Sequence, residues 1–160
     1  MKTLVVISDT HGNKKGVEQL KPLFLENDYA VYLGDGFSDF KEIFSEQPEK
    51  CYFCKGNCDF FAPLPEEGIL EVEKLRIFYC HGHRYGVKGT LVALAKRAKE
   101  LDCSVALYGH SHRPSIEELG GVTLINPGSL RFPATQGGSY AYLVVHGEKL
   151  TATIVGENPN

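Results

Sequence analysis

The chain has 160 residues, of which 23% are charged, and a formal net charge of -3 at pH 7. This length is typical of one domain with a substantial core, so we expect a single domain over residues 1–160. A duplex-binding surface normally carries a basic excess, and the acidic balance therefore argues against duplex nucleic acid as a partner.

The first half of the chain alternates predicted strands and helices. Apolar runs, mostly β-branched in the first of them, predict buried strands at residues 4–7, 29–33 and 51–55. Helical spacing of apolar residues predicts a helix over 14–26, in which Pro22 is expected to cause a kink or a break into two pieces. A shorter helix is expected to run through Phe44 and to be capped by Ser38 or Asp39.

The second half is richer in strands. An irregular, cleft-shaping loop is expected over residues 60–67, followed by a hairpin of strands 68–72 and 75–79. Thr90 is expected to cap a helix through Leu101. Further strands are predicted at residues 104–108, 116–119, 122–125 and within 140–154. This order of elements predicts an α/β fold with two packed sheets.

Nearly every strand that is predicted to be buried ends in a cluster of Asp, Asn or His. The clustered residues are Asp9, His11, Asp35, Asn57, His81, His83, His110 and His112. Ligands of open α/β sheets bind beyond the carboxyl ends of the strands, so these side chains are expected to form one site. An Asp-x-His pair alone is more often structural, but five of the six histidines fall in these loops. Only His146 lies elsewhere, and it is expected to be an ordinary surface residue.

The donor types at these strand ends are carboxylate, amide oxygen and imidazole. Such a set suits Mn, Fe(II), Ni or Zn better than Mg or Ca, which prefer all-oxygen shells. About seven ligands are too many for one tetrahedral ion, but they fit two ions that share a carboxylate, roughly 3.5–4 Å apart. The expected cofactors are therefore two divalent transition-metal ions, with Mn(II) favoured and Ni, Fe or Zn as alternatives.

Five motifs, in this order, resemble the signature of the calcineurin-like metallophosphoesterases, specifically their small single-domain prokaryotic phosphodiesterase branch. They are Asp9-Thr10-His11, Gly34-Asp35, Gly56-Asn57-Cys58-Asp59, His81-Gly82-His83 and Gly109-His110-Ser111-His112. The resemblance covers essentially the whole chain, and Asn126-Pro127-Gly128-Ser129 is similar to a recurring loop of this branch. It implies a four-layer α/β/β/α sandwich of two mixed sheets flanked by helices.

The resemblance also implies a ligand set and an activity. By the family pattern, the first metal would be held by Asp9, His11 and His112, the second by Asn57, His81 and His110, with Asp35 bridging them. The implied activity is hydrolysis of a small phosphoester, most simply a diester, with a metal-bridging hydroxide as the nucleophile. Two alternatives stay open: a non-catalytic metal-binding scaffold of the same fold, and a phosphomonoesterase or nucleotide pyrophosphatase.

One position departs from the family pattern. Many relatives carry a histidine after the Asn, where it assists the leaving group, and here Cys58 stands in its place. A thiol with a pKa of about 8.5 is a poorer proton donor than an imidazolium. The expected catalytic residues are therefore Asp35, Asn57, Cys58 and, as a substitute proton donor, His83.

Several other residues admit two interpretations. Arg84, Lys88, Arg113 and Arg131 either clamp phosphate oxygens or are solvated surface charges. Phe60, Phe61 and Tyr85 either line the substrate cleft or cover a homo-oligomer contact.

Cysteine content and the amino terminus bear on the compartment. The five cysteines are an odd number, so free thiols are expected, and Cys51 and Cys54 should point to opposite faces rather than form a zinc site. Only five uncharged residues separate Lys2 from Ser8, too few for a secretory signal or a membrane span. We therefore expect a cytoplasmic protein with no membrane partner.

Overall fold

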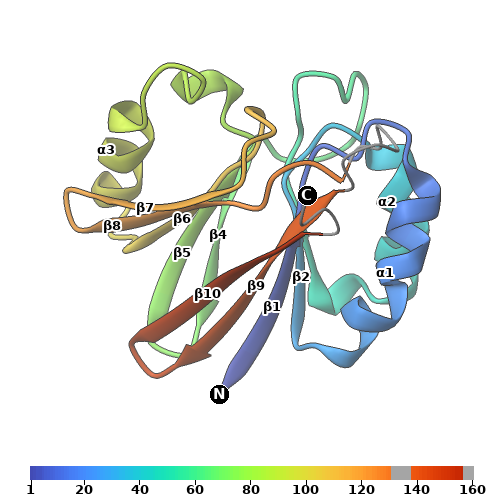
Figure 1. Cartoon of the computed structure of the whole chain (residues 1–160), viewed down its shortest axis with the longest axis horizontal. Helices are drawn as coiled ribbons and strands as arrows, with labels where there is room; N and C mark the ends of the chain where they lie inside the picture. The colour runs from blue at the N-terminus through green and yellow to red at the C-terminus, as the bar shows by residue number, and fades with distance from the viewer. Residues whose placement is uncertain (131–137, 157–160) are drawn as a thin grey trace.

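The computed structural model describes residues 1–130 and 138–156, which form two five-stranded sheets packed face to face (Figure 1). The strand order of the first sheet is β10 (Lys149–Gly156), β9 (Ser139–His146), β1 (Lys2–Ile7), β2 (Tyr29–Tyr32) and β3 (Cys51–Phe53). The order of the second is β4 (Glu67–Val72), β5 (Leu75–Cys80), β6 (Val105–Leu107), β8 (Val122–Asn126) and β7 (Ser115–Leu119). Each sheet contains both parallel and antiparallel pairs, so both are mixed.

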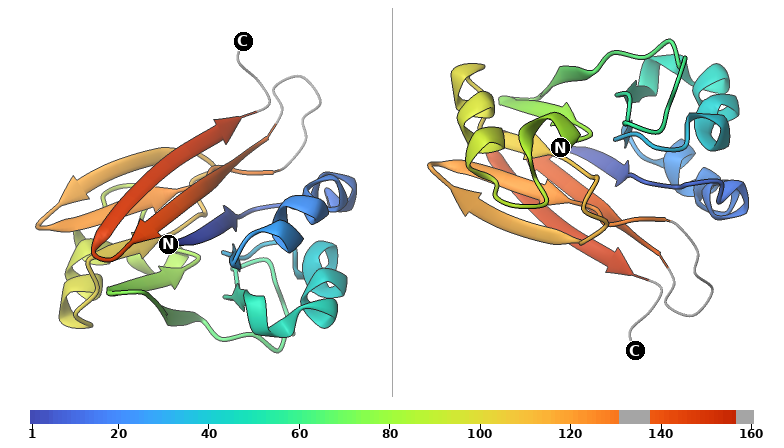
Figure 2. Two further views of the ribbon diagram at one scale, coloured as in Figure 1. Left: turned by 90° about the horizontal axis from the view of Figure 1, so that it is seen from below. Right: turned by 90° about the horizontal axis from the view of Figure 1, so that it is seen from above.

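Helices cover the outer faces of both sheets (Figure 2). The helices α1 (Lys14–Glu26) and α2 (Phe37–Glu46) lie on the first sheet, and α3 (Val92–Glu100) lies on the second. Short 3₁₀ helices, η1 (Pro48–Lys50) and η2 (His83–Tyr85), follow α2 and β5. The α/β/β/α sandwich expected from the sequence is confirmed. Among the described residues, no helix is long and apolar enough to cross a membrane.

The apolar run of β1 is explained by its position inside the sandwich. Leu4 and Val6 point into the core between the two sheets, whereas Val5 and Ile7 pack in the core under α1 and α2. All four side chains are fully buried. Because successive side chains of a strand alternate between faces, only an uninterrupted apolar run satisfies both cores.

Parallel pairing brings the carboxyl ends of six strands to one edge of the sandwich. In the first sheet β2 pairs in parallel with both β1 and β3. In the second, β6 pairs in parallel with both β5 and β8. The amide of Gly109, after β6, donates to the carbonyl oxygen of His81, after β5, at 2.8 Å. The polar strand ends seen in the sequence therefore lie together at this edge.

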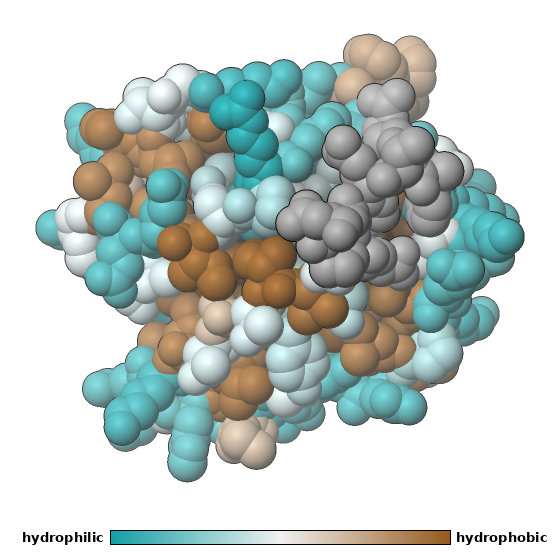
Figure 3. Space-filling model, viewed as in Figure 1, coloured by the Kyte–Doolittle hydropathy of each residue, from teal (hydrophilic) through white to brown (hydrophobic). Residues whose placement is uncertain are grey.

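β10 forms an edge of the first sheet, with one side facing the core. Leu150, Ala152 and Ile154 pack against the core between the sheets, and the intervening Thr151 and Thr153 are exposed. Figure 3 shows apolar side chains at the surface over this strand, with hydrophilic side chains around them. The alternation is that of a half-buried edge strand.

The first helix has the predicted bounds but is not divided at Pro22. α1 runs without interruption from Lys14 to Glu26, with Pro22 inside it, so the expected break into two pieces is wrong. Pro22 lies on the exposed side, where water can satisfy the backbone carbonyl group that loses its helical partner. The apolar face on the opposite side, which buries Val17 and Phe24, holds the two halves in one helix.

The predicted caps of α2 and α3 are also corrected. α2 begins after Gly36, and neither Ser38 nor Asp39 caps it. The Asp39 carboxylate instead accepts hydrogen bonds from the Thr10 hydroxyl group, at 2.6 Å, and from the Gly12 amide, at 2.8 Å. The cap position of α3 is Leu91 rather than Thr90, one residue later than expected.

Other expectations are confirmed. All five cysteines are free, and Cys51 and Cys54 lie in different cores, on opposite faces of the first sheet. The hairpins β4–β5, β7–β8 and β9–β10 form with antiparallel registers. His146, at the end of β9, is an exposed residue.

Candidate metal centre

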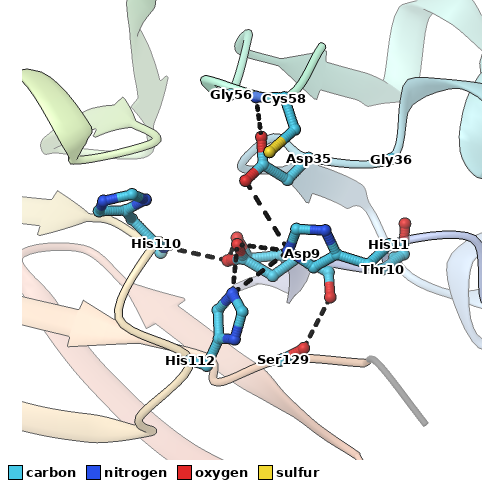
Figure 4. Close-up of polar contacts among 12 residues, drawn as sticks. Asp9, Thr10, His11, Asp35, Gly36, Gly56, Cys58, His110, His112 and Ser129 are labelled. Atoms are coloured by element: carbon cyan, nitrogen blue, oxygen red, sulfur yellow. Dashed lines mark hydrogen bonds and ion pairs between the residues drawn. The ribbon is translucent and has the colours of Figure 1, made fainter.

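Asp9 lies at the centre of the polar strand ends and comes directly after Ser8, at the end of β1. Its side chain is fully buried. One oxygen, Oδ1, lies 3.1 Å from Nε2 of His112 and 3.4 Å from Nε2 of His11. The other, Oδ2, accepts hydrogen bonds from the Ser8 hydroxyl group and, at 3.0 Å, from the backbone amide of His110. Asp9 therefore joins the loop after β1 to the loop after β6 (Figure 4).

Asp35 is the second buried carboxylate, and it follows β2. Its Oδ2 atom lies 3.2 Å from Nε2 of His81 and 3.8 Å from Nε2 of His11. Its Oδ1 atom accepts a hydrogen bond of 2.8 Å from the backbone amide of Cys58. Nε2 of His81 also lies 3.2 Å from Nδ1 of His110. A single oxygen of Asp35 thus faces imidazoles from both sheets.

The donor atoms gather into three overlapping groups, in each of which all atoms lie within 4.8 Å of one another. The groups are Asp9 with His11 and His112; Asp35 with His81 and His110; and His11 with Asp35 and Cys58. Figure 4 shows His11 between the two carboxylates, with Cys58 beside Asp35. The overlap places Asp35 and His11 where two neighbouring ions would meet.

Two further predicted residues, Asn57 and His83, lie at the margin of the donor cluster. Asn57 is exposed, and its side-chain amide donates to the sulfur atom of Cys58 at 3.6 Å. The ring of His83 lies 5.4 Å from that of His81 and 6.1 Å from that of His110, measured between centroids. Its Nδ1 atom is buried and has no hydrogen-bond partner among the described residues.

The hydrogen bond of His81 fixes which of its nitrogens can bind a metal. Nδ1 lies 2.6 Å from the carbonyl oxygen of Leu33 and donates its proton there. In the neutral ring, Nε2 then carries a lone pair directed at the Asp35 carboxylate. Two lone pairs at 3.2 Å repel unless a proton or a metal ion lies between them. A backbone carbonyl that orients an imidazole in this way is typical of metal sites.

The charges of the two carboxylates call for a cation. Among the described residues, no lysine or arginine forms an ion pair with Asp9 or Asp35. Burial by itself would raise the pKa of Asp9, but hydrogen bonds from His11 and His112 outweigh it and hold the pKa well below its usual range. The pKa of Asp35 is likewise lowered, with burial opposed by the hydrogen bond from His81. Two buried anions without a permanent cation fit a site for divalent metal.

The surroundings shift the pKa values of the histidines in different directions. Burial would lower the pKa of His81, but its hydrogen bond to Asp35 and the charge of Asp9 raise it. Burial and the neighbouring His81 lower the pKa values of His83 and His110. Neutral imidazole is the form that binds a metal, so the lowered pKa of His110 suits a ligand. Partial burial and the charge of Asp35 raise the pKa of the Cys58 thiol.

The backbone of the site is held in an unusual conformation. Eight non-glycine residues of the described chain have positive φ angles, and five of them are predicted ligands. The five are Asp9 (54°), His11 (43°), Asp35 (65°), His110 (69°) and His112 (61°). This region is uncommon for residues with a side chain and costs roughly 1–2 kcal/mol each. Such clustering of strain at one place is typical of functional sites.

Two glycines allow the loops after β2 and β3 to approach each other. Gly34 has a φ of 104°, and a Cβ atom there would lie 2.6 Å from the backbone nitrogen of Gly56. A Cβ atom at Gly56 would lie 2.1 Å from an oxygen of Asp35. At both positions a side chain would collide with the neighbouring loop, which explains why glycine stands there.

Asp59 is a positioning residue whose part the sequence did not reveal. Its buried carboxylate accepts four backbone hydrogen bonds, from Asp35 (2.7 Å), Gly36 (2.9 Å), Phe37 (3.1 Å) and Gly56 (2.9 Å). It thereby fixes the loop that carries Asp35 against the loop that carries Asn57 and Cys58. Its place in the Gly-Asn-Cys-Asp motif was the only signal in the sequence.

Asn126, at the end of β8, and the loop that follows it support the segments on the other side of the donor cluster. The side-chain amide of Asn126 donates to the Ser111 hydroxyl group at 2.9 Å and to the Gly109 carbonyl at 3.3 Å. The Ser129 hydroxyl group donates to the backbone carbonyl of Asp9 at 2.7 Å. This loop therefore orients the segments that carry Asp9, His110 and His112.

Of two clefts in the described surface, the first opens onto the donor cluster, and the second is lined by none of the candidate ligands. The first, of about 430 Å³, is lined by His11, Asp35 and Cys58 on one side and by residues 60–63 on the other. The second, of about 750 Å³, includes Lys88 and Arg113 in its lining. Arg84 is exposed and lines neither cleft, and Arg131 lies outside the described residues. Tyr85 packs on the α3 side, where its hydroxyl group donates to Glu67.

Comparison with known proteins gives a consistent result. A model of the calcineurin-like phosphoesterase superfamily domain matches residues 1–149. The chain is 34% identical to a Bacillus subtilis (strain 168) protein named Probable metallophosphoesterase YsnB, over 98% of this chain and 92% of the relative. It is 31% identical to Phosphodiesterase YfcE of Escherichia coli (strain K12), over 83% of this chain and 82% of the relative.

A solved structure shows the same architecture. A crystal structure of a conserved protein from Streptococcus pneumoniae TIGR4, described as a predicted phosphoesterase, superimposes with a TM-score of 0.83. The sequences are 28% identical, and the match covers 97% of this chain and 89% of the other. The fold and the order of its elements are therefore shared over nearly the full length.

Proposed function

The chain belongs to the calcineurin-like phosphoesterase superfamily, and we propose that it is a phosphodiesterase that hydrolyses a small phosphoester with two divalent metal ions. The observation that carries the proposal is the position of Asp35 Oδ2, 3.2 Å from His81 and 3.8 Å from His11. One carboxylate oxygen between imidazoles of two donor groups is the arrangement that a bridging ligand needs.

The residues fit a dinuclear site as follows. Asp9, His11 and His112 would hold one ion, and His81 and His110 the other, with Asp35 between them. Asn57 is proposed to complete the second set by turning its amide oxygen inward from its exposed position. The mixed oxygen and nitrogen donors favour Mn(II), with Fe, Ni or Zn as alternatives. When bound, two such ions lower the pKa of a shared water toward neutrality and neutralise charge on phosphoryl oxygens.

The protein contributes orientation and proton transfer. The fully buried Asp9 and the four backbone bonds to Asp59 hold the carboxylates in place before a substrate arrives. Cys58, whose sulfur lies within 4.8 Å of donor atoms of His11 and Asp35, is the nearer group for protonating a leaving oxygen. His83, beside His81 and His110, is the alternative.

The test combines metal analysis with turnover. The purified full-length chain is expected to bind about two Mn(II) ions and to hydrolyse bis(p-nitrophenyl) phosphate, with loss of activity to a chelator and recovery on adding Mn(II). Asp35→Asn is expected to lose both bound metal and activity. Asp102→Asn is the matched control, because Asp102 is an exposed aspartate that also has a positive φ, of 57°.

The outcomes separate the candidate functions. No bound metal after soaking in Mn(II) would contradict the proposal, as would full activity in Asp35→Asn. Bound metal with no turnover of diesters or monoesters would indicate a metal-binding scaffold. Faster turnover of monoesters than of diesters would indicate a phosphomonoesterase instead.

A further inference from the structure

Two adjacent phenylalanine side chains stand exposed at the mouth of the first cleft. Phe60 is 76% exposed and Phe61 is 99% exposed. Both line the cleft that His11, Asp35 and Cys58 close on the other side. Their rings therefore border the same space as the candidate ligands. Exposed apolar rings that cluster at a cleft are characteristic of a binding surface rather than of scattered surface residues.

The backbone presents these two rings in a defined way. The amide of Asp59 bonds to the carbonyl of Gly56, and the amide of Ala62 bonds to the carbonyl of Asp59, both at 3.2 Å. Asp59 is itself held by its carboxylate bonds to the loop that carries Asp35. Phe61 has a φ of 65°, which is rare for a bulky residue. The segment is thus tied to the donor cluster, and its strained residue, Phe61, exposes its ring instead of packing it in a core.

We propose that Phe60 and Phe61 form a subsite for a planar aromatic group, such as a nucleobase, carried by one ester substituent of the substrate. The inference rests on the proposed phosphodiesterase function and deepens it by naming a substrate class. Aromatic rings stack on the planar π-system of any base, so such a subsite would accept different bases but would bind alkyl groups less well. The cleft volume of about 430 Å³ lies within the range of small-molecule sites.

The second cleft differs from the first in what lines it. Its lining includes charged side chains of both signs, Lys88 and Arg113 with Glu117 and Glu118, and no phenylalanine ring among the described residues. None of the candidate ligands lines it, whereas His11 and Asp35 line the first cleft. An aromatic substituent of an ester bound at the ligands is therefore matched to the first cleft, where Phe60 and Phe61 lie.

The first experiment measures inhibition of bis(p-nitrophenyl) phosphate hydrolysis by two ligands that differ only in the base. Adenosine 5′-monophosphate is expected to inhibit at least about fivefold better than ribose 5-phosphate, because stacking one base contributes a factor of about 5 to 150. Phe61→Ala and Phe60→Ala should bring the ratio close to one. Phe61→Tyr should keep it, and so should Leu25→Ala, a change at an exposed residue on α1.

The second experiment does not depend on turnover. The chain contains no tryptophan, so Phe61→Trp introduces a single tryptophan at the subsite, whose fluorescence can be excited apart from that of the tyrosines. Adenosine 5′-monophosphate should quench its fluorescence in the metal-loaded protein, and ribose 5-phosphate should not. Leu25→Trp serves as the control and should respond to neither.

The results distinguish this inference from the proposed function. Turnover with equal inhibition by the two ligands and no quenching would overturn the subsite and leave the phosphodiesterase intact. Quenching by the nucleotide without any turnover would support the subsite and remove the proposed function. A fluorescence change that depends on protein concentration alone, together with a dimer in light scattering, would assign the two rings to a contact between copies and overturn the subsite.

Discussion

The two sheets contribute different chemistry to the candidate metal centre. Loops after strands of the first sheet carry both buried carboxylates, Asp9 and Asp35, and the loops after the second sheet carry only imidazoles among the predicted ligands. Those imidazoles belong to His81, His110 and His112. The two carboxylates and the imidazoles of the second sheet therefore meet only when the sheets pack together, whereas His11 comes from the first sheet with the carboxylates. Metal binding and the packing of the sandwich are coupled for this reason.

The difference between the sheets also has a structural side. The carboxylates are fixed by many bonds: Asp9 through Ser8 and the His110 amide, and Asp35 through the Cys58 amide and the Asp59 bridge. Of the imidazoles, His112 is exposed and His110 is half-buried. His81, the third, is fully buried. The first sheet thus provides a fixed anionic base, and the second provides two donors that are more accessible than the carboxylates. Loss of a carboxylate should be more damaging than loss of an imidazole.

The largest effect is expected from removing a carboxylate. Asp9→Asn should weaken metal binding by about 10²–10³-fold, because leaving buried charged partners uncompensated costs about 3–5 kcal/mol. His112→Asn, which removes an exposed neutral donor of the same group, should weaken it by a smaller factor. Metal content by mass spectrometry and titration with a competing chelator would check both. Equal losses in the two variants would show that charge does not distinguish the sheets.

The next effect should come from the bridge that joins the loops of the first sheet. Asp59→Asn replaces a carboxylate that accepts four backbone bonds with an amide that has only one acceptor oxygen. Each oxygen accepts two of these bonds, so we expect a loss of about 3–6 kcal/mol in the free energy of unfolding, at about 1.5–3 kcal/mol for each of two charge-assisted bonds. Denaturant unfolding of the metal-free chain measures it.

Asp102→Asn is the control for Asp59→Asn, since its carboxylate is exposed and has no such bridge within the described part of the chain, and it should unfold like the native protein. An unfolding free energy of Asp59→Asn within about 0.5 kcal/mol of the native value would contradict the positioning role of Asp59.

A smaller effect is expected from crowding the same loops. Gly34→Ala would place a methyl group 2.6 Å from the Gly56 backbone and should cost about 1–3 kcal/mol. Gly121→Ala is the matched control, because Gly121 also has a positive φ, of 82°, but its new methyl group would meet no described atom within 4 Å beyond its chain neighbours. The difference between the two unfolding free energies isolates the close approach from the backbone strain that they share.

Much of this arrangement could be predicted from the sequence. The run from Leu4 to Ile7 defines a strand buried on both faces, because only two cores require four apolar residues in succession. The donors at strand ends follow, since parallel strands bring their carboxyl ends to one edge. The partners of the donors are set by packing of the two sheets, and which ion each donor would hold stays a prediction.

The positioning residues could not be predicted in the same way. Asp59 acts on backbone amides, which every residue other than proline carries, so its partners leave no pattern in the sequence. Asp39 is of a residue type that often caps helices, but its carboxylate accepts a hydrogen bond from Thr10, which is distant in the sequence, instead of capping the backbone of its own helix. The exposure of Phe60 and Phe61 depends on where their loop runs, and an irregular loop has no periodicity from which to infer it.

The smallest effect concerns Cys58, which the first sheet places beside Asp35. A thiol is a poor proton donor near neutral pH, so the rate should depend steeply on how well the leaving group bears negative charge. Aryl diesters should react well and alkyl monoesters slowly. Cys58→His should raise the rate for poor leaving groups by about tenfold, which is less than the roughly 10²–10⁴-fold that general-acid catalysis typically contributes. Cys58→Ser should not raise it. A leaving-group series with Mn(II), on diesters and monoesters, gives the slope for each variant. A flat dependence of the rate on the leaving group in the native protein, with the chemical step limiting, would instead assign proton donation to a residue such as His83. Because His83 follows a strand of the second sheet, acid catalysis would then belong to the second sheet, and the carboxylates would belong to the first.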